Sequence, residues 1–557
     1  MDDLKVYSPR WDDIVKAKEG IQKVAGELGL RMNPNKCAVH SLHMPAPGNM
    51  TAGMDEIPIL GSSSLYKYLG AEQNTLISMD HLWTRVCESA LSAARRIMLS
   101  NLAVRQKVNG YNQVVIPKLK YAISCVIYGT GKLGTMRKQA RVFDESVRKL
   151  LAESHMRFGH SCVPRLYVNK EEGGLGLKSA EEEMEHTIVY TWCYLASHPD
   201  LRVPYHLCES LRSSNKRSLT SDFNSILTEN RLENEVARLA QACIRVKERT
   251  FETATNAARA ISSLVHERWS HTRMHEWQQR EVASRVIRNN EADEEPFICK
   301  KDSFLWSQVG WVSSEVLRNV WAAQEGSLPT KGSASGQSIW PNSNQLCRMR
   351  CPAKETAEHI VSACNHWRTN IMLERHDNVA SVIYHALKRK YGLTSRVSNT
   401  HVPHIVEGDQ VIIHWNDRIL TRENLRHDRP DIVVRDLKEK MIWIIKISVS
   451  WYTRINQQEL KKIRKYGMNS CLPEETGPDE FYPGPNPKAA LQAQHRMRVE
   501  IVPIVIGTCG ECSTHLRDYV RSLKLRDSTK AIMERLQICA VLGTNRIIKC
   551  HMSNTDL

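Results

Sequence analysis

Three cysteines and one histidine near residue 350 have the types and the spacing of a structural zinc site. They are separated by gaps of three, seven and four residues, and they are Cys347, Cys351, His359 and Cys364. Zn²⁺ prefers thiolate and imidazole ligands, and four of them complete the tetrahedral set of a site that stabilises a fold. Coincidence is the alternative, because 16 cysteines and 22 histidines in 557 residues form some clusters by chance. We predict a zinc knuckle over 346–370 that needs its metal to fold.

Two tryptophans, Trp340 and Trp367, flank this predicted knuckle. Exposed indole rings can stack on unpaired bases, and such stacking is worth ~1–3 kcal/mol per base. The alternative is that the two rings cover the small apolar core of the knuckle.

A second set of residues has the types found in metal-dependent phosphodiesterases. Asp431 follows Arg429 and Pro430 at the start of a short strand, the apolar run 441–451 predicts a buried second strand, and two lysines follow at Lys462 and Lys465. A carboxylate in this position holds Mg²⁺, and a nearby cation stabilises the developing negative charge. Taken alone, Pro430-Asp431 is more typical of an ordinary strand start than of a catalytic site.

The N-terminus carries a third and weaker set. Asp2 and Asp3 are adjacent carboxylates of the kind that hold Mg²⁺ during phosphoryl transfer. The segment 29–37, which contains Lys36, follows after about thirty residues, and the segment Tyr66-Lys67-Tyr68-Leu69-Gly70 follows after about thirty more. Two acidic residues by themselves carry little weight, and it is the order of the three segments that matters.

In this order the segments resemble the C-terminal part of a non-LTR (LINE-type) retrotransposon reverse transcriptase that carries a CCHC zinc knuckle and a restriction-like endonuclease. The resemblance covers about 1–177 and 347–524. It implies that Asp2 and Asp3 are polymerase metal ligands and that Lys36 lies near the incoming triphosphate. It also implies a primer-gripping hairpin at Tyr66, Lys67, Tyr68 and Gly70, and a nuclease site that contains Asp431, Lys462 and Lys465.

The chain departs from this family in two places. It begins inside polymerase motif C, without motifs A and B, and two-metal catalysis needs carboxylates from both strands, so we expect no polymerase activity. Lys446 stands where the family has its second nuclease carboxylate, and its ammonium would repel an ion held by Asp431. Asn416 and Arg422 occupy places where the family often has aspartate, and the turn 436–440 offers a poor substitute.

The charge of the chain points to a polyanionic partner. Lys and Arg outnumber Asp and Glu by 77 to 61, which gives a formal charge of +16. The excess is uneven, since residues 101–160 hold eleven basic and three acidic side chains. An evenly solvated positive surface would not show this clustering. We therefore expect RNA and DNA as partners, with no membrane and no small-molecule substrate beyond nucleotides, and we expect phosphate contacts from Lys118, Lys120, Arg137 and Lys138.

The remaining signals concern location. The N-terminus has no basic start followed by an apolar core, and the longest apolar run, 441–447, is too short to span a bilayer. The cysteines show no secreted-protein framework and are best interpreted as reduced thiols. We expect a nuclear protein that passes through the cytoplasm and is not secreted. Cys509 and Cys512 form a CxxC pair of redox or metal type, but no partner motif lies nearby.

The expected architecture is multidomain, with α+β and α/β parts. It comprises a reverse-transcriptase palm remnant of short strands and turns over 1–75, a basic helical thumb over 76–177, a helical linker over 178–345, the knuckle over 346–370, and a PD-(D/E)xK-like restriction-nuclease domain over 371–557. Within 76–177, the glycine-rich segment 171–177 is expected to end one unit.

We therefore expect a retrotransposon RNA-directed DNA polymerase/endonuclease in truncated form, whose ancestral role is target-primed reverse transcription. The surviving activity would be zinc-dependent nucleic-acid binding. Two alternatives stay open: an active Mg²⁺-dependent DNA-nicking endonuclease, or a non-catalytic nucleic-acid-binding protein recruited by the host. Zn²⁺ is the expected cofactor, with Mg²⁺ added if catalysis remains.

Overall fold

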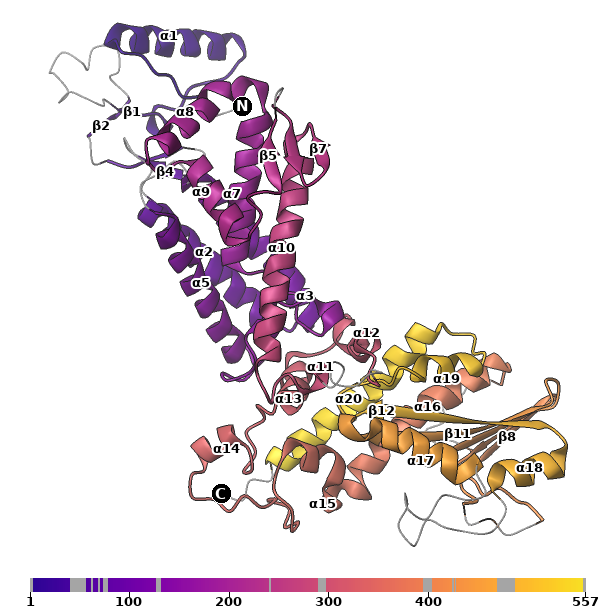
Figure 1. The fold of residues 1–557 in the computed structure, drawn as a ribbon. Helices are drawn as coiled ribbons and strands as arrows, with labels where there is room; N and C mark the ends of the chain where they lie inside the picture. The colour runs from indigo at the N-terminus through magenta and orange to yellow at the C-terminus, as the bar shows by residue number, and fades with distance from the viewer. Residues whose placement is uncertain are drawn as a thin grey trace. The chain divides into compact units, whose positions relative to one another are not determined.

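The protein has a mixed α and β fold in which helices predominate and the sheets are small (Figure 1). The computed structural model describes residues 4–40, 57–61, 64–68, 71–73, 79–126, 132–239, 242–288, 297–393, 403–422, 425, 427–467 and 486–553. Across those residues, no helix combines the length and the apolar character that crossing a bilayer requires.

Contacts divide the chain into two compact units, each built from three segments. Unit 1 consists of Met1–Ile97, Gly110–Arg148 and Lys178–Trp269, and unit 2 consists of Met98–Asn109, Lys149–Leu177 and Ser270–Leu557. The division passes between Leu177 and Lys178, directly after the glycine-rich segment. Within that segment Gly174 allows a close approach, because a Cβ atom there would lie 2.0 Å from the carbonyl oxygen of Val168.

Unit 1 begins with a helix that the sequence analysis did not predict. Residues 1–75 were expected to hold only strands and turns, but α1 spans Trp11–Glu27. Half-buried side chains recur along it at Trp11, Ile14, Lys18 and Ile21, which is helical spacing. Four short strands pair beyond it: β1 (Val39–His40) runs parallel to β2 (Ile59–Leu60), and β3 (Tyr66–Tyr68) runs antiparallel to β4 (Ala71–Gln73).

Most of unit 1 is helical, as expected for 76–177 and for much of the expected linker. Ser179 accepts a hydrogen bond from the Glu182 amide and caps α7, whose first turn carries three glutamates. The elements that lie wholly or mainly in unit 1 are α2 (Met79–Met98), η2 (Tyr111–Val115), α4 (Ile116–Val126), α5 (Leu133–Glu153), α7 (Ala180–Ser197), η4 (Pro199–Leu201), α8 (Arg202–Ser213), α9 (Leu219–Glu229) and α10 (Ala254–Gln278).

A three-stranded antiparallel sheet interrupts the stretch that we expected to be helical throughout. Its strands are β5 (Val236–Arg238), β6 (Ile244–Val246) and β7 (Arg249–Phe251). Each strand has three residues, and Lys247 takes a φ of 54° in the turn between β6 and β7. The sequence pattern missed this sheet because lysine replaces the glycine or asparagine that normally marks such a turn.

Unit 2 contains a five-stranded sheet in the order β12-β11-β10-β9-β8. Neighbouring strands are antiparallel except β11 and β12, which are parallel. The strands are β8 (Ile405–Gly408), β9 (Val411–Trp415), β10 (Ile432–Asp436), β11 (Met441–Ser450) and β12 (Arg498–Gly507). The strand expected to start at Asp431 and the strand expected over 441–451 are therefore present with slightly different bounds.

Helices cover both faces of this sheet (Figure 1). Because side chains alternate along a strand, Ile432 and Val434 face the helices α16 (Ile371–Lys390) and α20 (Thr529–Ser553). Val433 faces α17 (Ile455–Gly467) and α18 (Pro487–His495). The remaining elements of unit 2 are α3 (Val104–Gly110), α6 (Pro164–Tyr167), η3 (Lys170–Glu172), α11 (Arg285–Arg288), α12 (Lys300–Ser303), η6 (Leu305–Gln308), α13 (Ser314–Gln324), α14 (Ala334–Ile339), η7 (His359–Ala363), α15 (Asn365–Arg368), η8 (Tyr452–Arg454) and α19 (Leu516–Ser522).

Candidate functional site

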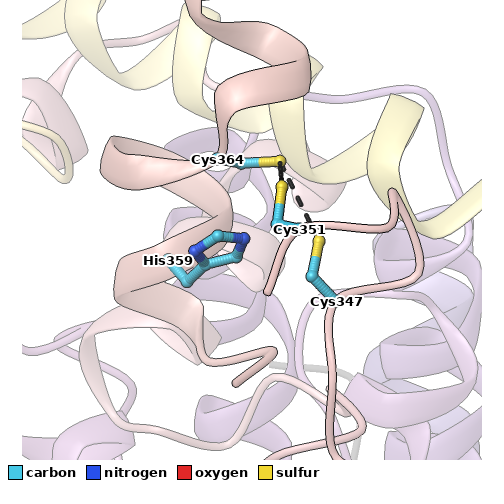
Figure 2. A group of neighbouring side chains, drawn as sticks. All are labelled: Cys347, Cys351, His359 and Cys364. Carbon is cyan, nitrogen blue, oxygen red and sulfur yellow. Dashed lines mark hydrogen bonds between the residues drawn. The ribbon is translucent and has the colours of Figure 1, made fainter. Parts of the chain in front are cut away.

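The four predicted zinc ligands come together in unit 2. All four side chains are buried, and their ligand atoms lie within 4.8 Å of one another. Figure 2 shows the three sulfur atoms grouped beside the ring of His359. The Sγ atom of Cys364 lies 4.0 Å from that of Cys347 and 3.6 Å from that of Cys351. A tetrahedral zinc site with Zn–S bonds of about 2.3 Å places its sulfur atoms about 3.8 Å apart.

Two local structures position these ligands. Cys347 and Cys351 lie on a tight turn that is closed by a bridge between Leu346 and Lys354. Arg350, at a φ of 59°, donates its amide hydrogen to the carbonyl of Cys347. His359 begins the helical turn η7, and Cys364 directly follows its last residue. Their side chains therefore lie on the same side of that turn, facing the two cysteines.

The donor set fits Zn²⁺. The Nε2 atom of His359 is buried, and within the described structure it has no hydrogen-bond partner, as expected for an atom whose partner is a metal ion. Burial and the neighbouring His551 lower the pKa of His359, which keeps the ring in the neutral form that binds metal. Zinc held by these four residues would supply a structural cross-link, with no open position for chemistry.

A buried network that sequence analysis missed supports this site. Glu355 accepts hydrogen bonds from the amide and guanidinium of Arg348, which lies between the first two cysteines. Its carboxylate also lies 3.1 Å from Nε2 of His551, in the last helix. The indole of Trp367 donates to Nδ1 of His551, so His551 carries its proton on Nε2 and donates it to Glu355. Nothing in the local spacing relates His551 to a knuckle nearly two hundred residues earlier.

This network bears on two questions that the sequence left open, namely how the knuckle is held and what Trp367 does. The knuckle is packed against α20 and is not free-standing, so zinc alone does not hold it. Trp367 is only 6% exposed, and it therefore covers the core of the knuckle and cannot stack on bases. Trp340 is half-buried, with the guanidinium of Arg348 5.4 Å from the centre of its ring.

Asp431, the predicted nuclease carboxylate, is fully engaged by the protein itself. The register pairs Ile432 with Ile445, so Asp431 faces Lys446 across the two strands. The Lys446 ammonium lies 2.7 Å from Oδ1, and the Ile447 amide donates to Oδ2 over 2.6 Å. His376 of α16 lies 3.6 Å from Oδ2. Burial opposes ionisation of Asp431, but His376 and Lys446 outweigh it and lower its pKa.

These residues do not fit Mg²⁺. The ion needs several oxygen ligands in near-octahedral order, and here the carboxylate of Asp431 is already paired with an ammonium. Asp436 and Glu439 lie at the other end of the strand pair, about 17 Å away for five extended residues. The backbone amide of Asn416 donates to the carbonyl of Asp431, and Arg422 is exposed. Neither side chain is a carboxylate, so neither replaces the missing one.

The two predicted nuclease lysines lie on α17. Lys462 is half-buried beside Lys446 and Asp431, and burial together with the Lys446 ammonium lowers its pKa to about 8. Lys465 is also half-buried on the same helix and adds to the positive potential at Lys462. Tyr466 lies on the same helix, and the centre of its ring is 6.0 Å from the Lys446 ammonium.

The four basic residues predicted to contact phosphates have different surroundings in unit 1. Lys120 pairs with Glu183 at 2.9 Å, and Arg137 pairs with Glu185 at 3.0 Å and with Glu229. Lys118 donates to the hydroxyl of Ser89. Lys138 is exposed, and in the described part of the chain no residue pairs with it. Two of the four predicted contacts are therefore ion pairs within the protein, which the local charge count did not foresee.

Of the polymerase-like residues, Asp2, Asp3 and Gly70 lie outside the described residues, as do the side chains of Lys67 and Tyr68. The phenol of Tyr66 donates to the carbonyl of Lys36, which brings two of the predicted segments together.

Cys509 and Cys512 are both buried, and the thiol of Cys512 accepts a hydrogen bond from Gln537. Burial raises the pKa of both thiols, which keeps them protonated. They are packing residues of a turn, and a redox role does not suit them.

No protein-family model matches this chain, and no curated protein matches it significantly. Its function must therefore be inferred from the two sites and from the distribution of charge.

Proposed function

We propose that this chain is a zinc-stabilised nucleic-acid-binding protein related to non-LTR retrotransposon proteins, and that its nuclease-like site does not cleave. The observation that carries the proposal is the ion pair between Lys446 and Asp431, which occupies the carboxylate that Mg²⁺ would need. The positive charge of the chain and the order of its motifs support a nucleic-acid partner. The retained role is binding of RNA or DNA in the nucleus.

The test combines binding and cleavage on the same zinc-loaded protein. We expect it to retard duplex DNA and single-stranded RNA of equal length, with an affinity that falls steeply as salt rises. We expect no nicking of supercoiled plasmid in Mg²⁺, because the site cannot hold the ion.

Two results would contradict the proposal. Absence of salt-dependent binding would remove the nucleic-acid partner. Plasmid nicking that disappears in Asp431→Ala would show an active nuclease, the second candidate, with another residue in the place of the missing carboxylate.

A further inference from the structure

The surroundings of Asp431 carry more positive than negative charge. Lys446 and Asp431 neutralise each other at 2.7 Å, and His376 is paired with Asp377 at 3.0 Å. Lys462 is left over, since none of the described residues forms a hydrogen bond or an ion pair with it. Asp431 attracts Lys462 only through space and is already paired with Lys446, so burial of the Lys462 ammonium destabilises the protein, and a directly bound anion would offset that cost.

The charge balance of this site equals that of a metal-bound phosphodiesterase site. Two carboxylates and one divalent cation sum to zero, and so do one carboxylate and one ammonium. In both arrangements a neighbouring lysine remains to face a phosphate. The Lys446 ammonium also has donor capacity to spare, because it has three N–H groups and contacts Asp431 and, at 3.5 Å, the carbonyl of Arg429.

We propose that Lys462, supported by Lys446, binds one backbone phosphate of a nucleic acid without any metal ion. The Lys446 ammonium occupies the place of the cation, and Lys462 makes the direct contact. This inference rests on the proposed function and assigns part of the binding to one place. It also reverses the role of Asp431, which would be needed for a metal site but opposes an anion here.

The experiment measures affinity for duplex DNA against salt concentration, in buffer without added divalent ions and with zinc left in place. Lys462→Gln should weaken binding roughly eightfold at 0.1 M salt and reduce the salt slope by about one unit, because one phosphate contact is lost. The matched control is Lys438→Gln, the same charge change on the exposed turn at the far end of β10 and β11, which should bind like wild type.

Asp431→Asn tests whether the negative charge of Asp431 weakens nucleic-acid binding, as we propose, or is needed for it. It should bind at least as tightly as wild type, and added Mg²⁺ should not change that. Wild-type affinity and slope in Lys462→Gln would overturn this inference alone, while the proposed function would stand. Weaker binding by Asp431→Asn protein that unfolds in urea like wild type, or binding by wild type that requires Mg²⁺, would show a metal site instead. Absence of nucleic-acid binding by wild type would overturn the proposed function as well.

Discussion

At the scale of single residues, the decisive feature is that Asp431 is shared between two cations. Burial opposes protonation of His376, but hydrogen bonds to Asp377 and Asp431 outweigh it and raise the pKa of His376 to about 9. The ring is therefore charged at neutral pH and binds the carboxylate together with Lys446. A buried charge with both partners in place is stable, while loss of one partner leaves the other uncompensated.

This arrangement predicts a specific dependence of stability on pH. The pKa of His376 is about 9 in the folded protein, against 6.5 unfolded, so its contribution is fully present below pH 6.5 and is lost as pH rises through 9. The contribution is on the order of 3 kcal/mol. In urea unfolding of unit 2, His376→Gln should be less stable than wild type at about pH 6 and equal to it at about pH 9.5.

His385 on the same helix serves as the control, because burial and the neighbouring Lys388 and Arg389 lower its pKa, away from the alkaline range in which His376 titrates. His385→Gln should keep the alkaline loss of stability that wild type shows. The same alkaline loss in His376→Gln would mean that another group is responsible.

At the scale of elements, the zinc knuckle depends on a distant helix. The turn that carries Cys347 and the helical turn that carries His359 meet α20 through Glu355 and His551. Residues around a metal site that orient it typically contribute 10–100-fold to metal affinity. The knuckle and the last turns of α20 should therefore act as one structural element.

We accordingly predict that His551→Phe lowers zinc affinity by about tenfold, because Glu355 and Trp367 lose a common partner. Competition with a chromophoric zinc chelator measures this. His366→Gln is the control, since His366 is an exposed histidine next to Trp367 and should leave the affinity unchanged. Zinc retained in His359→Gln but lost in His366→Gln would show that the ligand set is different.

At the scale of the whole molecule, positive charge in the sequence does not equal positive charge available to a partner. Part of the basic segment 101–160 is neutralised by the glutamates of α7, including the partners of Lys120 and Arg137. Binding should therefore depend on the exposed remainder. The neighbours Arg137 and Lys138 separate the two roles, because one is paired and the other is exposed.

Arg137→Gln should destabilise unit 1 by about 3–5 kcal/mol, because it leaves Glu185 buried without its cation. Its effect on the salt slope of binding should be small. Lys138→Gln should leave stability unchanged and reduce the salt slope by up to about one unit. Equal effects of the two variants on the slope would contradict this division.

Features that depend on short spacing and on strand alternation could be predicted from the sequence alone. The four candidate zinc ligands, the strands around Asp431 and Lys446, and the opposite charges of these two residues follow from residue types and local order. Sequence patterns did not predict α1 or the short sheet β5–β7, because neither element has strong capping or turn signals.

The pairing of charged side chains, in contrast, depends on how the chain packs in three dimensions. Lys120 with Glu183, Asp431 with His376, and Glu355 with His551 are contacts between residues far apart in the chain. Local patterns contain no information about such partners, since packing of the core brings them together. For the same reason the structure, and not the sequence, shows that none of the described residues forms a hydrogen bond or an ion pair with Lys462, and that Trp367 is buried.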